Sequence, residues 1–223
     1  MKNISIVSRF YKKVRFFLLL RFFPGSNQYW EQRYALNGTS GPGSYNKLAL
    51  FKAEVLNNFI EKNKISTIIE YGCGDGNQLK LAKYPHYMGF DISATAISLC
   101  QKLFQSDPTK TFSLMNAYKN EKAQMTLSLD VVYHLVEEEV FHTYMHRLFD
   151  SSERFVIIYS SDTDADLTGH SPYIKHRKFT KWVELHQPGW KLIEKIPNRH
   201  PYDGNAEEGS FADFFIFEKS IVN

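Results

Sequence analysis

The sequence predicts a doubly wound α/β fold in which a mostly parallel, seven-stranded sheet carries helices on both faces. Five apolar strand segments alternate with helical patterns, as expected when crossover helices join parallel strands. The last two strand segments have no helix between them, which predicts an antiparallel pair at the carboxyl end of the chain. A turn with three glycines, residues 72–76, follows the first strand at the position where open α/β sheets bind ligands.

The predicted elements follow one another in a regular order from residue 48 onward. Leu48, Phe51 and Val55 recur at helical spacing, and the charged residues 61–64 end that helix. Ser93 is placed to cap a later helix, and the β-branched run 155–159 is typical of a strand. The predicted strands are 65–71, 87–91, 112–115, 125–129, 155–159, 190–196 and 211–217, and the predicted helices are 48–59, about 77–83, 93–104, 136–149 and 179–186.

The chain length and the cysteine content indicate one domain in a reducing cytoplasm. At 223 residues the chain can form one well-buried domain with appendages. We predict a basic helix over 1–25, an N-terminal lid and helix over 26–64, and a catalytic domain over 65–223. Cys73 and Cys100 form neither a disulfide framework nor metal-ligand spacing, so no metal site is expected.

Charge is distributed unevenly along the chain. Residues 1–25 carry six basic side chains and no acidic one, with apolar residues at helical spacing. This pattern predicts an amphipathic helix that packs on the protein or lies on an anionic membrane. Its longest apolar run, 16–20, is far shorter than the roughly 20 residues that span a bilayer. The remaining chain has 21 basic and 24 acidic side chains, a poor electrostatic match for nucleic acid.

The turn after the first strand reads Glu70-Tyr71-Gly72-Cys73-Gly74-Asp75-Gly76. A dinucleotide fingerprint has the pattern Gly-x-Gly-x-x-Gly, whereas here the third glycine comes two residues after the second. A purely structural turn is the simpler interpretation. Asp91 ends the second strand, where a carboxylate can accept hydrogen bonds from both ribose hydroxyls of an adenosine, in NAD or in another cofactor.

This motif resembles the first motif of class I S-adenosylmethionine-dependent methyltransferases, and the element order resembles their Rossmann-like fold. The resemblance has definite motifs over residues 65–160, and it implies S-adenosylmethionine as the cofactor. It also implies that Glu70 faces the positive charge of the cofactor and that Asn116 and Ala117 contact its adenine. Asn116 stands where these enzymes often have an aspartate. The implied cofactor-binding residues are Glu70, Gly72, Cys73, Gly74, Gly76, Asp91, Ile92, Asn116, Ala117 and Asp130.

The segment after the fourth strand, residues 130–135, is expected beside the transferring methyl group. A hydroxyl acceptor gains from losing its proton, and histidine, with an ordinary pKa of about 6.5, is suited to accept it. We therefore predict His134 as the base, Asp130 as a group that orients it or touches the cofactor, and Tyr133 beside them. Asp130 and His134 share a face if the segment is helical. The alternative is a buried structural histidine and a capping aspartate.

Two further segments are predicted to cover the cofactor or to hold the acceptor. The aromatic segment 29–34 and the glycine-rich segment up to residue 44 precede the main domain, and their glycines would allow a lid to move. The loop 170–179 contains cationic side chains that could hold a phosphate or a carboxylate. An ordinary connection and a solvated helix start are the simpler interpretations. The predicted acceptor or lid residues are Tyr29, Trp30, Arg33, Tyr34, Ser40, Ser44, His176 and Arg177.

Together these residues predict a methyltransferase that acts at oxygen on a small, anionic or glycan-linked acceptor. The pattern from Tyr29 to Phe214 resembles small bacterial methyltransferases associated with surface-polysaccharide biosynthesis, which implies a cytoplasmic protein peripheral to the inner membrane. An N-methyltransferase, a non-catalytic partner-binding module and an NAD oxidoreductase remain as alternatives, and a homo-oligomer is left open. The chain lacks the Asn-Pro-Pro-Tyr signature, the strongest sequence indication of methylation on nucleic-acid bases.

Overall fold

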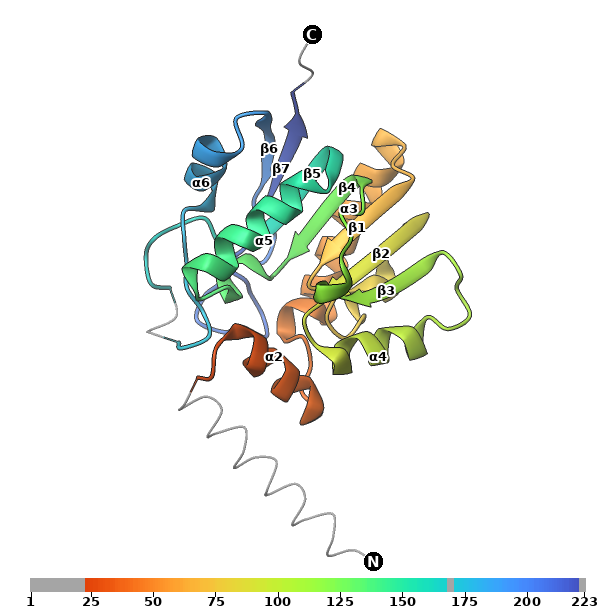
Figure 1. Ribbon diagram of the computed structural model, residues 1–223. Coiled ribbons are helices and arrows are strands. Elements are labelled where there is room, and N and C mark those ends of the chain that lie inside the picture. The colour runs from red at the N-terminus through yellow and green to blue at the C-terminus, as the bar shows by residue number, and fades with distance from the viewer. Residues whose placement is uncertain (1–22, 168–170, 221–223) are drawn as a thin grey trace, which may run out of the picture.

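The computed structural model describes residues 23–167 and 171–220. The strands of this part of the chain are β1 (Thr67–Tyr71), β2 (His86–Asp91), β3 (Lys110–Leu114), β4 (Ala123–Leu129), β5 (Ser152–Ser160), β6 (Trp190–Ile196) and β7 (Asp213–Lys219). They form one sheet in the order β3-β2-β1-β4-β5-β7-β6 (Figure 1). β1 to β5 pair in parallel, and β7 pairs antiparallel with β5 and β6. The predicted fold class is confirmed.

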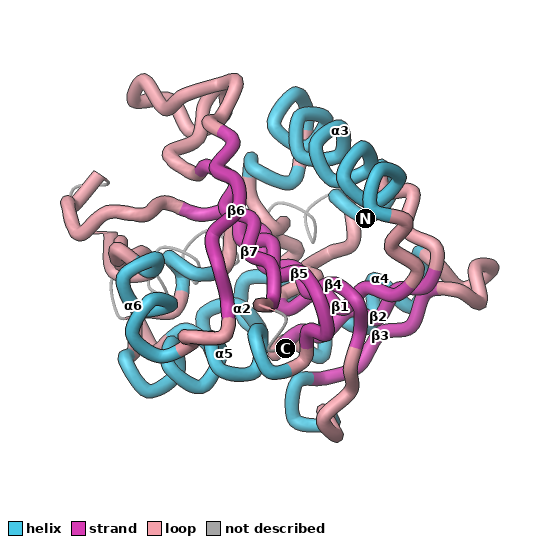
Figure 2. The backbone as a smooth tube through the Cα atoms, turned by 90° about the horizontal axis from the view of Figure 1, so that it is seen from above, coloured by secondary structure: helices cyan, strands magenta, loops and turns pink. Residues whose placement is uncertain are grey.

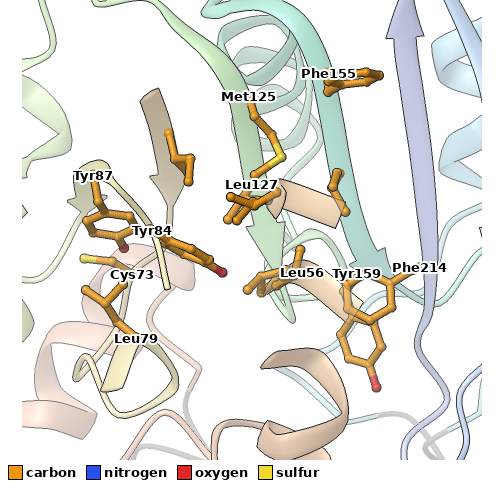
Figure 3. Close-up of a cluster of buried hydrophobic side chains, with 14 of the residues drawn as sticks. Leu56, Cys73, Leu79, Tyr84, Tyr87, Met125, Leu127, Phe155, Tyr159 and Phe214 are labelled. Carbon is orange, nitrogen blue, oxygen red and sulfur yellow. The ribbon is translucent and has the colours of Figure 1, made fainter. Parts of the chain in front are cut away.

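Helices cover both faces of the sheet (Figure 2). α3 (Asn46–Asn63) and α4 (Ala94–Leu103) contribute to one apolar core cluster, and α5 (Glu138–Asp150) and α6 (Phe179–His186) contribute to the other. The first cluster brings Leu56 of α3 together with Leu127 and Phe155 of the central strands (Figure 3). Burial of one such side chain contributes about 1.5–3 kcal/mol. The two clusters therefore stabilise the sheet on which the site is built.

A further helix, α2 (Ser26–Ala35), lies in the segment that the sequence predicts only as a lid. The sequence does not indicate it because it carries no apolar stripe; its buried side chains are Ser26, Tyr29 and Tyr34. Gly25, with a φ of 96°, precedes it. The predicted arm over 1–25 lies almost entirely outside the described residues. Among the helices that are described, none has the length and apolar character needed to cross a membrane.

The helix expected at about 77–83 is only a short 3₁₀ helix, η2 (Gln78–Leu81). Pro85 follows closely, and a proline disfavours the α conformation of the residue before it, so the helix cannot extend to β2. Three more 3₁₀ helices occur in the described chain: η1 (Pro42–Ser44), η3 (Met115–Ala117) and η4 (Val132–His134). The last two follow β3 and β4, where the sequence predicts site residues.

Candidate functional site

A cavity of about 760 Å³ lies at the carboxyl ends of β1, β2 and β4 and is covered by α2. β1 pairs with β2 on one side and with β4 on the other, so this is the topological switch point where α/β folds bind ligands. The cavity brings together residues from segments that are far apart in the sequence. The predicted residues that line it are Trp30, Tyr34, Ser40, Ser44, Glu70, Gly72, Cys73, Gly74, Asp91, Ile92, Asn116, Asp130 and His134.

The glycine turn is closely approached by other parts of the protein. Gly72, Gly74 and Gly76 have φ angles of 81°, 58° and 75°, which side chains rarely adopt. A Cβ atom on Gly72 would lie 2.5 Å from Val131, and one on Gly74 would lie 2.3 Å from Ser40 Oγ. Gly76 packs against α4 and does not line the cavity. The segment that carries Ser40 and the loop after β4 therefore require Gly74 and Gly72 independently of any ligand.

Asp91 ends β2 with its carboxylate buried beside the glycine turn. The backbone N–H groups of Gly74 and Ser93 donate to its two oxygens, each at 2.9 Å. Burial raises the pKa of Asp91 to about 6, although these hydrogen bonds favour the ionised form. Ser93 caps α4 by accepting from the Ala96 N–H, as the sequence predicts. Asp91 is therefore not the helix cap, and it lines the cavity.

Glu70 is a second buried carboxyl group in the cavity lining. The Tyr87 hydroxyl donates to Glu70 Oε2 at 2.8 Å. Burial raises the pKa of Glu70 to about 7. At neutral pH this side chain is therefore close to half protonated, and a cation bound beside it would favour the ionised form.

Lys52 is a cavity residue that the sequence analysis misses. Its Nζ lies 2.5 Å from Asp130 Oδ2, and the two side chains are only 1% and 11% exposed. The Tyr133 hydroxyl donates to the other oxygen of Asp130 at 2.8 Å. A lysine on an amphipathic helix is usually exposed. Lys52, however, falls between Leu48 and Leu56 at intervals of four residues, a spacing that places it on the buried stripe of α3.

The helical face predicted to join Asp130 to His134 does not form. Asp130 has a φ of 59°, and its N–H donates to the carbonyl of Tyr159 at 2.9 Å, so the chain turns before η4 begins. The oxygens of Asp130 are bonded to Lys52 and Tyr133. The prediction that Asp130 orients His134 is therefore wrong, and Asp130 belongs to a separate network.

His134 lines the cavity with one ring nitrogen bound to the backbone. Its Nδ1 lies 2.9 Å from the carbonyl oxygen of Tyr173, and a carbonyl can only accept, so Nδ1 carries the proton. Burial lowers the pKa of His134 to about 4, which keeps the imidazole neutral at physiological pH. The lone pair of the ring is therefore on Nε2. Trp30 packs edge-on against the ring, with centroids 4.8 Å apart.

α2 is held across the cavity by two carboxylates, one near its middle, Glu31, and one that binds its first residue, Glu137. Glu31 accepts from the hydroxyls of Ser93 and Thr95, at 2.6 and 2.7 Å, at the start of α4. Ser26 donates to Glu137 from its N–H at 2.9 Å and from its hydroxyl at 2.6 Å, just before α5. α2 thus joins the two sides of the cavity, and its role as a lid stays a prediction.

Several solved structures with a similar fold are methyltransferases. N-methyltransferase NodS from Bradyrhizobium japonicum WM9, in complex with S-adenosyl-L-homocysteine, is 14% identical with a TM-score of 0.66, over 87% of this chain and 98% of that one. Magnesium protoporphyrin IX methyltransferase (ChlM) from Synechocystis PCC 6803, also with bound S-adenosyl-L-homocysteine, is 16% identical with a TM-score of 0.57, over 76% and 83%. The methyltransferase domain of bacterial CtHen1-C is 15% identical with a TM-score of 0.59, over 76% and 97%. The chain has a methyltransferase fold.

At these identities the likeness concerns the fold, so the reaction is argued from the site. No protein-family model matches the sequence. No curated protein matches it either.

The described residues of the cationic loop after β5, 171–179, do not line the cavity. Arg177 donates to the backbone carbonyls of Leu135 and Val136, at 2.6 and 2.8 Å. His176 is buried, and its Nδ1 lies 2.7 Å from the Ser161 hydroxyl. These contacts hold both side chains inside the protein, which corrects the prediction that they bind an anionic acceptor; residue 170 lies outside the described residues. The other predicted residues outside the lining are Tyr29, Arg33, Gly76, Ala117 and Tyr133.

Carboxyl groups outnumber cations along the cavity. The lining acids are Glu31, Glu70, Asp75, Asp91, Asp130 and Glu139, and the lining cations are Lys52 and Arg147. Such a lining suits a positively charged ligand. α5 extends the cavity through Val140, Thr143, Tyr144 and Arg147, which the sequence analysis misses because periodicity does not show which helix face meets a cavity. In the described chain no group of His, Cys, Asp and Glu side chains is arranged to hold a metal ion.

Proposed function

We propose that the protein is an S-adenosylmethionine-dependent methyltransferase. The observation that carries the proposal is Asp91, a buried carboxylate that ends β2 in the cavity wall and is bonded to the glycine turn. The fold supports it, because NodS and ChlM share that fold and contain bound S-adenosyl-L-homocysteine.

The residues of the cavity fit this cofactor. Among the described residues, neither Glu70 nor Asp91 forms a salt bridge, so a cationic ligand complements both buried carboxyl groups. Asp91 would hold the ribose hydroxyls, Glu70 the positive amino-acid end, and Asn116 with Ile92 the adenine. When bound, the cofactor supplies a methyl group activated by its sulfonium.

We further propose that the methyl group goes to an oxygen and that His134 is the base. The neutral imidazole keeps its Nε2 lone pair because Nδ1 donates to the Tyr173 carbonyl. Nε2 would take the proton of an acceptor hydroxyl as the oxygen is methylated. A small or glycan-linked acceptor follows from the sequence resemblance. His176 and Arg177 do not line the cavity, so they no longer support an anionic acceptor.

An amine is the second candidate acceptor. The acid-rich lining would attract a cationic substrate, and NodS is an N-methyltransferase. An amine often needs no dedicated strong base. His134→Ala should therefore be mild for transfer to an amine and severe for transfer to a hydroxyl, with cofactor affinity retained in both cases.

We also propose that residues 1–25 hold the protein on an anionic membrane surface. Ser26, Asn27 and Trp30 line the cavity, so the basic arm joins the described chain at the cavity wall. An acceptor held at the membrane would then lie close to the site. Removal of residues 1–25 should abolish sedimentation with anionic liposomes and leave binding of S-adenosyl-L-homocysteine intact. If the full-length protein does not sediment, the membrane proposal is wrong.

Calorimetry with S-adenosyl-L-homocysteine tests the cofactor assignment. We expect binding by the wild type and at least tenfold weaker binding by Asp91→Ala, because a hydrogen bond to a charged group contributes about 1.5–3 kcal/mol and about 1.4 kcal/mol is tenfold. No binding by the wild type would overturn the proposal, and binding of NADH instead would favour an oxidoreductase.

Labelled S-adenosylmethionine, incubated with a panel of nucleotide sugars, phosphorylated metabolites and amines, identifies the acceptor. Transfer to a hydroxyl that is lost in His134→Ala supports the proposed base. Cofactor binding without transfer to any acceptor would favour a non-catalytic module.

A further inference from the structure

The hydrogen bond that fixes His134 comes from a distant segment of the chain. The Tyr173 carbonyl, 39 residues further on, accepts from His134 Nδ1 at 2.9 Å. The same segment is tied down once more by the Lys175 N–H, which donates to the Tyr133 carbonyl at 2.8 Å. The position of residues 173–175 therefore decides whether His134 has a backbone partner.

Tyr173 is held in turn by the lid. Its ring stacks on Tyr29 of α2, with centroids 4.9 Å apart and an angle of 8° between the planes. Tyr29 is 0% exposed, and its hydroxyl accepts from Arg33 Nη1 at 3.0 Å. Tyr29 also packs edge-on against Trp30, whose ring touches His134. Tyr29 does not line the cavity, so its contacts with the site pass through these neighbours.

We infer that Tyr29 is a positioning residue, whose ring holds the Tyr173 carbonyl against His134 and so fixes which imidazole nitrogen carries the lone pair. This inference rests on the proposed role of His134 as a base. The position of Tyr29 links two features of the protein. α2 covers the cavity, and the stack of its Tyr29 on Tyr173 sets the tautomer of His134 below it.

The chemical consequence follows from the two tautomers of a neutral imidazole. With Nδ1 bonded to a carbonyl, the proton stays on Nδ1, and Nε2 can accept a proton from a hydroxyl. Without that partner, the proton can occupy either nitrogen and the ring can rotate about its χ2 bond. A ring with the proton on Nε2 cannot act as the base there. The stack of Tyr29 on Tyr173 therefore keeps the population in the competent form.

The test uses full-length protein, with and without S-adenosyl-L-homocysteine, and records imidazole ¹⁵N resonances by long-range ¹H–¹⁵N correlation. In the wild type we expect His134 Nδ1 in the protonated range and Nε2 in the unprotonated range. Tyr29→Leu removes the stack, and the two resonances should move toward each other. Tyr173→Leu removes the half-buried ring of the stack and keeps the backbone carbonyl. It should therefore have the same effect as Tyr29→Leu. Tyr29→Phe keeps the stack and should retain the wild-type pattern.

A matched control separates this role from general loss of stability. Tyr84 is 5% exposed and stacks on Tyr87 in the core cluster that includes α3 and α4, with centroids 5.8 Å apart. Tyr84→Leu should lower the melting temperature as Tyr29→Leu does and leave the His134 resonances unchanged. The inference is overturned if folded Tyr29→Leu and Tyr173→Leu both keep the wild-type pattern, or if Tyr84→Leu shifts the resonances equally.

The same variants show their effect in turnover once an acceptor is known. Tyr29→Leu should lower kcat by about ten- to a hundredfold, the effect of a misplaced catalytic group, with KM for S-adenosylmethionine unchanged. Tyr29→Phe should restore kcat. Failure of the proposed function would appear separately, as a wild type that binds no S-adenosyl-L-homocysteine while its His134 resonances still respond to Tyr29→Leu.

Discussion

Replacement of Lys52 by methionine should destabilise the protein by about 3–5 kcal/mol, the cost of breaking a buried ion pair on one side. Lys52 and Asp130 are only 1% and 11% exposed, so the variant leaves a carboxylate with little access to water and one remaining bond, from Tyr133. Methionine fills nearly the same volume as the lysine stem. Since 1 kcal/mol lowers the melting temperature of a chain this long by about 2–4 °C, the expected fall is roughly 6–20 °C.

Urea unfolding of four proteins measures this coupling: the wild type, Lys52→Met, Asp130→Asn and the double variant. Removal of both charges should cost less than Lys52→Met alone, because no unpaired charge is then buried. A loss below about 1 kcal/mol in Lys52→Met, or strictly additive losses in the double variant, would refute the argument from burial.

Three further predictions concern the cavity wall. Burial raises the pKa of Glu70 from 4.5 to about 7, so between these values the native state holds a proton that the unfolded state has lost. The free energy of unfolding should fall as the pH rises through this window, and Glu70→Gln should flatten the slope; equal slopes in urea titrations would contradict this. Glu31→Gln weakens the hydrogen bonds from Ser93 and Thr95 that hold α2. S-adenosyl-L-homocysteine should therefore dissociate about tenfold faster in stopped flow, a change of about 1.4 kcal/mol. An unchanged dissociation rate would show that α2 does not control release. Gly74→Ala places a Cβ 2.3 Å from the Ser40 hydroxyl at a φ of 58° and should cost about 1–3 kcal/mol of stability. Gly189→Ala, with open space around its Cβ, should be neutral, and equal melting temperatures of the two variants would show that the turn tolerates a side chain.

The features predicted from the sequence are those with a local signal. Alternating apolar segments give the strands and their order of appearance, and a terminal pair without a helix gives the antiparallel edge. Asp91 is predictable because it ends a strand, and the carboxyl ends of parallel strands share one edge of a sheet. Ser93 is predictable as a cap because capping depends on residues three positions apart.

The features that the sequence does not reveal depend on contacts between distant segments. Arg177 lies in a run of cations typical of a solvated loop, and only the fold brings it to the carbonyls of Leu135 and Val136, 42 and 41 residues away. α2 has no apolar period, and it is held by the stack of Tyr29 on Tyr173 and by hydrogen bonds of Ser26 and Glu31 to distant segments. Lys52 is buried by a carboxylate 78 residues later in the chain.

Three carboxyl groups of the cavity wall, Glu70, Asp91 and Asp130, are assigned together to the cofactor by the sequence, but they differ in how the protein compensates their charge. Asp130 has a resident cation, Lys52, at 2.5 Å, so its charge is already matched without any ligand. Glu70 and Asp91 have no such partner among the described residues, and burial instead raises their pKa values to about 7 and about 6. A cation that enters the cavity favours the ionised form of Glu70 and Asp91 and is attracted to the charge that results. The charge balance therefore supports the proposal that Glu70 and Asp91 face a cationic cofactor. Asp130, in contrast, is matched by Lys52 and belongs to the framework that holds the loop carrying His134.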